Sequence, residues 1–187
     1  MGANIFTSMP YIPYRIVMAL IENDDFCKLV YYNTMDALEQ PNLTDEQKRN
    51  LIWNGDVTRT DKYHIFLTNV QPNEEIENRC VIKIYNSHID PDNLYGAVAN
   101  FRFDILFGSK IPLVYADGIP CNRGDLIERE IMRSLNDEDC AGVGHLQYNG
   151  ELSNLCGSAT GIGNNYTYTG RTVVMATMIY DDKVSCP

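Results

Sequence analysis

A chain of 187 residues with a net charge of −10 is long enough for one ordinary domain with its own core. Hydrophobic residues make up 44% and charged residues 21% of the chain, which excludes a largely disordered protein. The basic residues are scattered and form no stripe that could neutralise successive phosphates, which disfavours tight binding to duplex DNA as a function.

The start of the chain predicts an arm followed by two helices. Residues 1–12 lack a basic stretch followed by an apolar one, so they are expected to form an arm and not a secretory signal. Pro13 suits a first helical position, and the apolar residues from 16 to 21 recur at helical spacing. Asn23 or Asp24 then provides the N-cap of a second, short helix.

A third helix is predicted after the break at Pro41. Thr44 and Gln47 have the spacing of a capping box, and Leu51, Ile52 and Trp53 follow within the predicted helix. Asn54-Gly55 is expected to end it, so residues 13–55 form a helical part.

Three β-rich segments follow, at residues 62–70, 79–89 and 97–108. In the last of them the residue types alternate, which predicts a strand with one apolar face and one mixed face. The apolar face comprises Phe101, Phe103 and Ile105, and the other face comprises Arg102, Asp104 and Leu106. Residues 109–122 are expected to form a loop that turns at Asp117-Gly118.

The tripeptide Arg123-Gly124-Asp125 suggests cell adhesion, but the residues after it predict a helix over 125–136. Asp125 stands three residues before Glu128, so it is expected to act as the N-cap of this helix. An adhesive tripeptide needs an exposed, flexible loop, and a match of this length has low specificity. The sequence therefore favours a structural role for Asp125.

The remaining residues predict the closing part of a sheet. The segment 142–150 and the alternating segment 166–182 are expected to be strands, joined by a Gly/Ser/Asn-rich loop at 151–165 that we expect to be mobile in the isolated protein. The element order predicts an α+β fold, with an antiparallel sheet flanked by helices. We expect a single domain over 1–187, with the sheet and its helix 125–136 lying within 62–182.

The sequence predicts no catalytic, cofactor-binding or metal-binding residue. The glycine-rich segment 157–165 lacks the lysine of a phosphate-binding loop, and Asp90 and Asp92 lack the glycine and distal glutamate of a calcium loop, which favours a proline-containing turn there. No two cysteines lie within four residues of each other, so zinc-binding spacing is absent. A catalytic pair such as Cys140 with His145, assembled in three dimensions, stays open as an alternative. The cysteines are Cys27, Cys80, Cys121, Cys140, Cys156 and Cys186.

Several segments, taken in order, resemble the head–tail connector (neck) proteins of tailed bacteriophages, and among them most the tail terminators. The first is the helical part, "YRIVMALIENDDFCKLVYY" leading to "LTDEQKRNLIW". The second is the strand "NFRFDILFG", followed by a loop and the helix "RGDLIEREIMRSLN". The third is "GVGHLQY" paired with the terminal strand "GRTVVMATMIYDD". The longer helical N-terminus departs from the smallest terminators and keeps the stopper class open.

The resemblance implies a structural virion protein without enzymatic activity. It would form a ring, commonly a hexamer, that joins the tail tube to the head connector, with neck, stopper, tube or sheath proteins as its neighbours. DNA would pass through the lumen without tight binding, which acidic walls favour. Assembly in the host cytoplasm and residence in the virion neck follow from this function. A small cytoplasmic binding protein and a cysteine-dependent enzyme are the alternatives.

Overall fold

The computed structural model describes residues 9–69, 78–91, 96–136, 145–148, 157–162 and 168–180. Helices come first along the chain, then strands, one further helix and two more strands, so the α+β prediction is confirmed. The helical segments are η1 (Met9–Tyr11), α2 (Ile12–Ile21), α3 (Asp24–Tyr31), η2 (Ala37–Glu39), α4 (Asp45–Asn50), η3 (Thr60–Lys62) and α5 (Arg123–Leu135). Among the described residues, no helix is long and apolar enough to cross a membrane.

The first two α-helices begin close to the predicted positions, but residues 9–12, which were expected to belong to the arm, form η1 and the start of α2. Pro13 lies in the first turn of α2, where its missing N–H removes no helical hydrogen bond. The N-cap of α3 is Asn23, whose side-chain oxygen accepts a hydrogen bond from the Phe26 amide at 3.1 Å.

Helix α4 has the predicted capping box but is shorter than predicted. The Thr44 side chain accepts from the Gln47 amide, and the Gln47 side chain accepts from the Thr44 amide. The helix ends at Asn50 because the next residues pair with the segment around Ile65. The Trp53 amide donates to the Ile65 carbonyl at 2.9 Å, so the expected end at Asn54-Gly55 is wrong.

The main sheet has five strands in the order β1-β2-β3-β7-β6. Strand β1 is parallel to β2, whereas the other neighbours are antiparallel, so the all-antiparallel prediction is wrong at this edge. Only Ile65–Phe66 of the predicted strand at 62–70 form a strand, β1, because residues 60–62 form a 3-10 turn. The strands are β1 (Ile65–Phe66), β2 (Cys80–Pro91), β3 (Gly96–Gly108), β7 (Tyr168–Tyr180) and β6 (Gly157–Ile162).

Two segments that were expected to be irregular are part of this sheet. Strand β2 continues through Pro91 after a bulge at Asn86/His88, where the sequence predicts a turn. Strand β6 lies inside the predicted loop 151–165 and pairs with β7, because backbone pairing needs no apolar side chains. The predicted mobility of residues 151–156 and 163–165 lies outside the described residues. Of the strand expected at 142–150, the described residues 145–148 form only isolated bridges, and the bridge between Gln147 and Ala176 is the expected pairing with the last strand.

Residues 109–122 contain a β-hairpin where the sequence predicts only a loop. Strand β4 (Leu113–Ala116) pairs with β5 (Ile119–Asn122), and Asp117-Gly118 forms the predicted turn. Both turn residues have positive φ, 52° for Asp117 and 76° for Gly118. Asp-Gly favours this tight turn, whose twist matches that of the paired strands.

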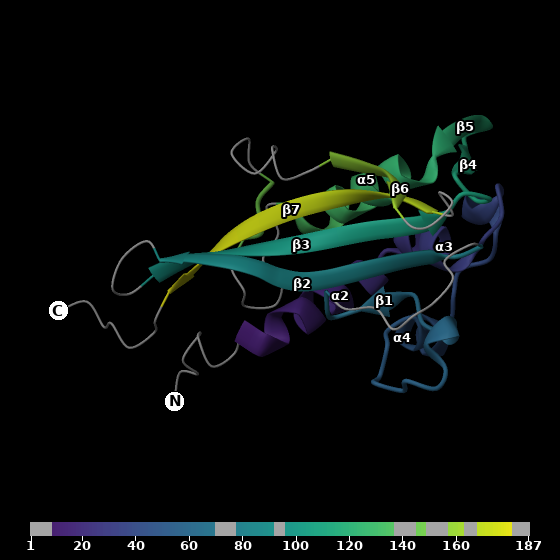
Figure 1. The fold of residues 1–187 in the computed structure, drawn as a ribbon. Helices are drawn as coiled ribbons and strands as arrows, with labels where there is room; N and C mark the ends of the chain where they lie inside the picture. Colours follow the sequence, from purple (N-terminus) through teal and green to yellow (C-terminus); the bar gives the residue numbers. More distant parts are fainter. Residues whose placement is uncertain are drawn as a thin grey trace.

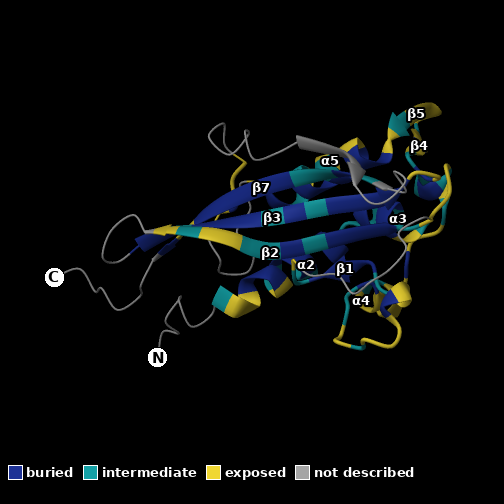
Figure 2. Ribbon diagram, viewed as in Figure 1, coloured by how far each residue is buried: buried dark blue, intermediate teal, exposed yellow. Residues whose placement is uncertain are grey.

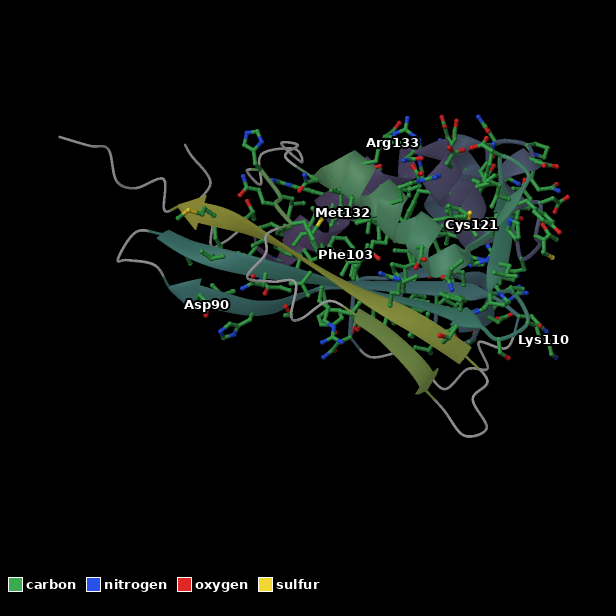
Figure 3. The ribbon with its side chains drawn as sticks, turned by 90° about the horizontal axis from the view of Figure 1, so that it is seen from above. Asp90, Phe103, Lys110, Cys121, Met132 and Arg133 are labelled. Carbon is green, nitrogen blue, oxygen red and sulfur yellow. The ribbon has the colours of Figure 1, made fainter. Side chains whose placement is uncertain are left out.

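The two faces of the main sheet differ. Helices α2, α3 and α5 lie on one face, where Phe101, Phe103 and Ile105 are buried in the main core (Figures 1 and 3). The opposite face, here called the helix-free face, carries Arg102, Asp104 and Leu106, as the alternation predicts. Figure 2 shows half-buried positions side by side in the middle of β2, β3 and β7, and Arg102 and Asp104 of β3 are half-buried residues of this face.

Candidate functional site: the β4–β5 hairpin and its buried arginine

The cap of helix α5 is Asn122, and not Asp125. The Asn122 side-chain oxygen accepts hydrogen bonds from the Gly124 and Asp125 amides at 2.8 and 3.3 Å. Asp125 instead lies inside the first turn, and its carboxylate pairs with Arg171 on β7. The capping prediction at Asp125 is therefore wrong by three positions, because Asn122 leaves the hairpin with an extended backbone and Asp125 is already helical.

Arg123 is fully buried and donates only to backbone carbonyls. Its Nε donates to the Ile111 oxygen at 2.9 Å, and its Nη1 donates to the Leu29 and Tyr32 oxygens at 2.6 and 2.9 Å. Its Nη2 donates to the Thr34 oxygen at 2.9 Å. Burial lowers the pKa of the Arg123 guanidinium. An adhesive tripeptide needs an accessible arginine, so this one has a structural role.

These hydrogen bonds fix the base of the hairpin to the end of α3. The Arg123 amide donates to the Pro112 oxygen at 2.9 Å, so the backbone and the side chain of Arg123 bind two successive residues, Ile111 and Pro112, at the base of the hairpin. The Tyr115 amide in β4 donates to the Met35 oxygen at 2.7 Å, which fixes the hairpin to the segment after α3. A guanidinium matches several carbonyls at once because its donors have a fixed planar geometry. The hairpin is thus held at its base and its middle.

The hairpin that these hydrogen bonds hold in place exposes large apolar side chains. Leu113 and Tyr115 are 40% and 39% exposed on β4, while Val114 between them is fully buried. Ile119, the first residue after the turn, is 62% exposed. Tyr115 pairs with Pro120 across the hairpin, so these two residues and Leu113 share one face of this small sheet, whereas Ile119 pairs with Ala116 on the other face and is exposed at the tip. We call the side chains of Leu113, Tyr115, Ile119 and Pro120 the hairpin patch.

An acidic groove of about 340 Å³ lies beside the hairpin patch. Its lining includes Asp25, Glu39 and Asp117 together with Tyr115 and Arg129. The only lining arginine is engaged by the neighbouring buried Glu130, which accepts from Arg129 Nε and Nη2 at 2.8 Å each. The groove therefore presents a negative edge to the hairpin patch.

Glu130 also ties α5 to α3. It is fully buried, and its second oxygen accepts from Asn23 Nδ2 at 3.0 Å. Asn23 is the N-cap of α3 and donates in addition to the Ser134 hydroxyl at 2.9 Å. The buried carboxylate is thus hydrogen-bonded, as such a group must be to stay in the interior. It holds together the two helices that support the hairpin.

A polar network occupies the middle of the helix-free face. Asp104 accepts from the Tyr85 hydroxyl at 2.8 Å, from Arg102 Nε at 2.7 Å and from the Thr172 hydroxyl at 2.8 Å. Burial, followed by the hydrogen bond to Asp104, raises the pKa of Tyr85 to about 12. Partial burial lowers the pKa of the nearby Lys83. The network joins β2, β3 and β7 without a residue placed as a nucleophile.

The buried cysteines in the described part of the chain do not have the properties of a catalytic thiol. Cys27 and Cys80 are buried, and burial raises the pKa of each thiol to about 12, far from the range of a reactive thiolate. His64 is buried with Nδ1 2.9 Å from the Cys80 carbonyl oxygen. Cys140 lies outside the described residues, so its pairing with His145 is not tested. Within the described ranges, no three His, Cys, Asp or Glu side chains gather to hold a metal ion.

Sequence reasoning did not identify the hairpin patch or the buried arginine. The Asp-Gly turn was a signal for the hairpin, since two β-capable segments flank it. Nothing local to Arg123 shows that it is buried, because three of its four side-chain acceptors lie some ninety residues earlier in the chain, with sequence separations of 94, 91 and 89.

Comparison with known proteins identifies the family of this chain. Residues 23–177 match the YomW family, so this chain belongs to that family. The family is phage-derived, of the type found in Bacillus prophages like SPbeta, which makes the chain a phage-associated protein. No curated protein and no solved structure matches the chain.

Proposed function

We propose that this phage protein is a structural protein of the virion neck, most similar to a tail terminator, and that it forms a ring joining the tail to the head connector. The phage origin of the family and the order of helices and strands support this proposal. We propose further that the function is non-catalytic and that the protein resides in the assembled particle.

The observation that carries the proposal is the rigid, apolar hairpin patch. A protein that acts alone gains nothing from holding Leu113, Tyr115 and Ile119 in water. A hairpin fixed in advance by Arg123 loses little conformational entropy when another protein covers it. The geometry therefore suits permanent contact with a protein neighbour. A ring in a neck needs such contacts with its own copies and with adjacent rings.

The charge of the chain supports the passage of DNA through such a ring. With 15 basic and 25 acidic residues, the surface repels phosphate more than it attracts it. DNA would then slide past without being held. A stopper or another neck ring protein is the neighbouring candidate, because it needs the same kind of contacts.

The proposal is tested in a phage that encodes this chain. We expect deletion of its gene to leave heads and tails unjoined, and we expect the protein in purified particles by mass spectrometry. Antibody labelling of the end of free tails would identify a terminator, whereas labelling of heads would identify a stopper. Infectious particles assembled without the protein would contradict the neck function and favour the small cytoplasmic binding protein.

A further inference from the structure

The hairpin patch needs an occupant, and the chain itself carries a surface that fits it. A hollow of about 380 Å³ lies between α3, α4 and the residues before β1. It is lined by Tyr31, Gln47, Asn50, Leu51, Lys62 and Tyr63. Two aromatic rings and a leucine form the apolar part of the lining, and the amide side chains and the lysine form the polar part. We call these six residues the socket.

The charges of the two surfaces are complementary. The socket contains Lys62 and no carboxylate, although the whole chain has a net charge of −10. Asp117 lies in the turn of the hairpin, two residues before Ile119, and the acidic groove lies beside the hairpin patch. Two copies of so acidic a chain repel each other unless the contact surfaces have opposite local charge. Asp117 against Lys62 provides such a pair.

The exposure of the side chains also suits this contact. Ile119 projects from the tip of a hairpin and is 62% exposed, so it can enter a hollow without any rearrangement of its own strand. Tyr31 is 37% exposed in the socket, where a large apolar side chain would remove it from water. Burying apolar area on both sides is the main favourable term in association.

The positions of the two surfaces suit a ring. Figure 1 shows the hairpin beyond the α5 side of the molecule and α4 beyond the β2 side, both toward the same end of the long strands. The hairpin patch and the socket share no residue. A contact between two different surfaces leaves one of each unoccupied in every pair, so copies continue to add until the ring closes.

We infer that the hairpin patch of one copy docks into the socket of the next copy of this chain. This inference rests on the proposed ring and names its subunit contact. Arg123 acts in the contact as a positioning residue, since it fixes the hairpin without reaching the neighbour.

Two single variants and their mixture test this contact by native mass spectrometry of the full chain. Ile119→Asp places a charge on the hairpin, and Lys62→Glu reverses the charge of the socket; both residues are exposed, so the fold should tolerate them. We expect the wild type to form a closed oligomer and each variant to fall to the monomer mass of 21.2 kDa. Thermal melts that match the wild type show that each variant is folded.

An equal mixture of the two variants gives the sharpest result. The Ile119→Asp copy keeps its socket and the Lys62→Glu copy keeps its hairpin, so the pair can form one sound contact. We expect a heterodimer that grows no further. Tyr14→Asp is the matched control, because Tyr14 is a 49% exposed aromatic residue on α2 outside both surfaces, and it should leave the oligomer intact.

Four results would overturn the inference. They are a wild type that stays monomeric at its highest soluble concentration, variants that assemble like the wild type, a mixture that forms no dimer, and a control that dissociates like the variants. None of them decides the neck proposal, which depends on the content of particles and on the joining of heads to tails.

Discussion

The two faces of the main sheet are built from alternate residues of the same strands, yet they use different interactions. On the covered face, Phe101, Phe103 and Ile105 pack among side chains of the helices with no access to solvent. On the helix-free face, Asp104 collects hydrogen bonds from neighbouring strands and keeps partial contact with water. The comparison teaches that the helices and the alternation of the strand residues act together: the covered face forms the main core, whereas the helix-free face combines a polar network with a small apolar cluster of Phe66, Val81 and Leu106. Four predictions test it, from the largest expected effect to the smallest.

Phe103→Ala should cost most, because it leaves a cavity in the covered face. Phe103 is fully buried and pairs across the sheet with Ile84 and Val173. We expect a loss of about 3–5 kcal/mol in the free energy of unfolding. Urea unfolding followed by circular dichroism measures it. A loss below that of the Asp104 variant described last would contradict the comparison.

Arg123→Met tests the charged group that the interior does contain. The substitution keeps an apolar chain of similar length but leaves the Ile111, Leu29 and Thr34 carbonyls without their donor. We expect a loss of about 3 kcal/mol, because buried acceptors without partners are costly. Hydrogen exchange should also speed up in the hairpin, starting with the Tyr115 amide. Unchanged exchange there would show that the hairpin is held by other contacts.

His64 makes stability depend on pH. Burial, with a smaller contribution from the charge of Arg79, lowers its pKa from 6.5 to about 4. The unfolded chain therefore binds the proton first, so the stabilisation is complete above pH 6.5 and is lost as the pH falls toward 4. Between pH 7.5 and pH 5 we expect a loss of about 2 kcal/mol.

The matched control for this pH effect is His64→Asn, which cannot titrate in that range. Its unfolding free energy should change less between the two pH values than that of the wild type. An equal change in both proteins would assign the pH dependence to the carboxylates instead.

Asp104→Asn should cost least, about 1 kcal/mol, because the network on the helix-free face is partly solvated. The amide keeps one acceptor but loses the charge that Arg102 and Tyr85 face. The pKa of Tyr85 should fall from about 12 toward its ordinary value, which ultraviolet absorbance measures directly. It should stay partly raised, since burial is the larger cause. A phenol that titrates as before would show that Asp104 does not reach it in solution.

The sequence by itself determined those features that depend on neighbouring residues. The capping box at Thr44 and the Asp117-Gly118 turn were predicted, and the cap at Asn23 was one of the two predicted positions, because each is a contact between residues close in the chain. The two faces of β3 also followed from alternation alone, because successive side chains of a strand point in opposite directions.

Only the tertiary structure decided the features that depend on distant partners. Residues 51–53, which were predicted to be helical, pair instead with the segment of β1. The glycine-rich residues of β6 form a strand because they pair with the backbone of β7. Arg123 looked like part of an exposed motif, yet its donors are satisfied by carbonyls of a segment far away in sequence. A buried charge is stable only where several acceptors converge. Only the packed chain brings these carbonyls together. Their hydrogen bonds to Arg123 fix the hairpin, which in turn exposes its apolar side chains.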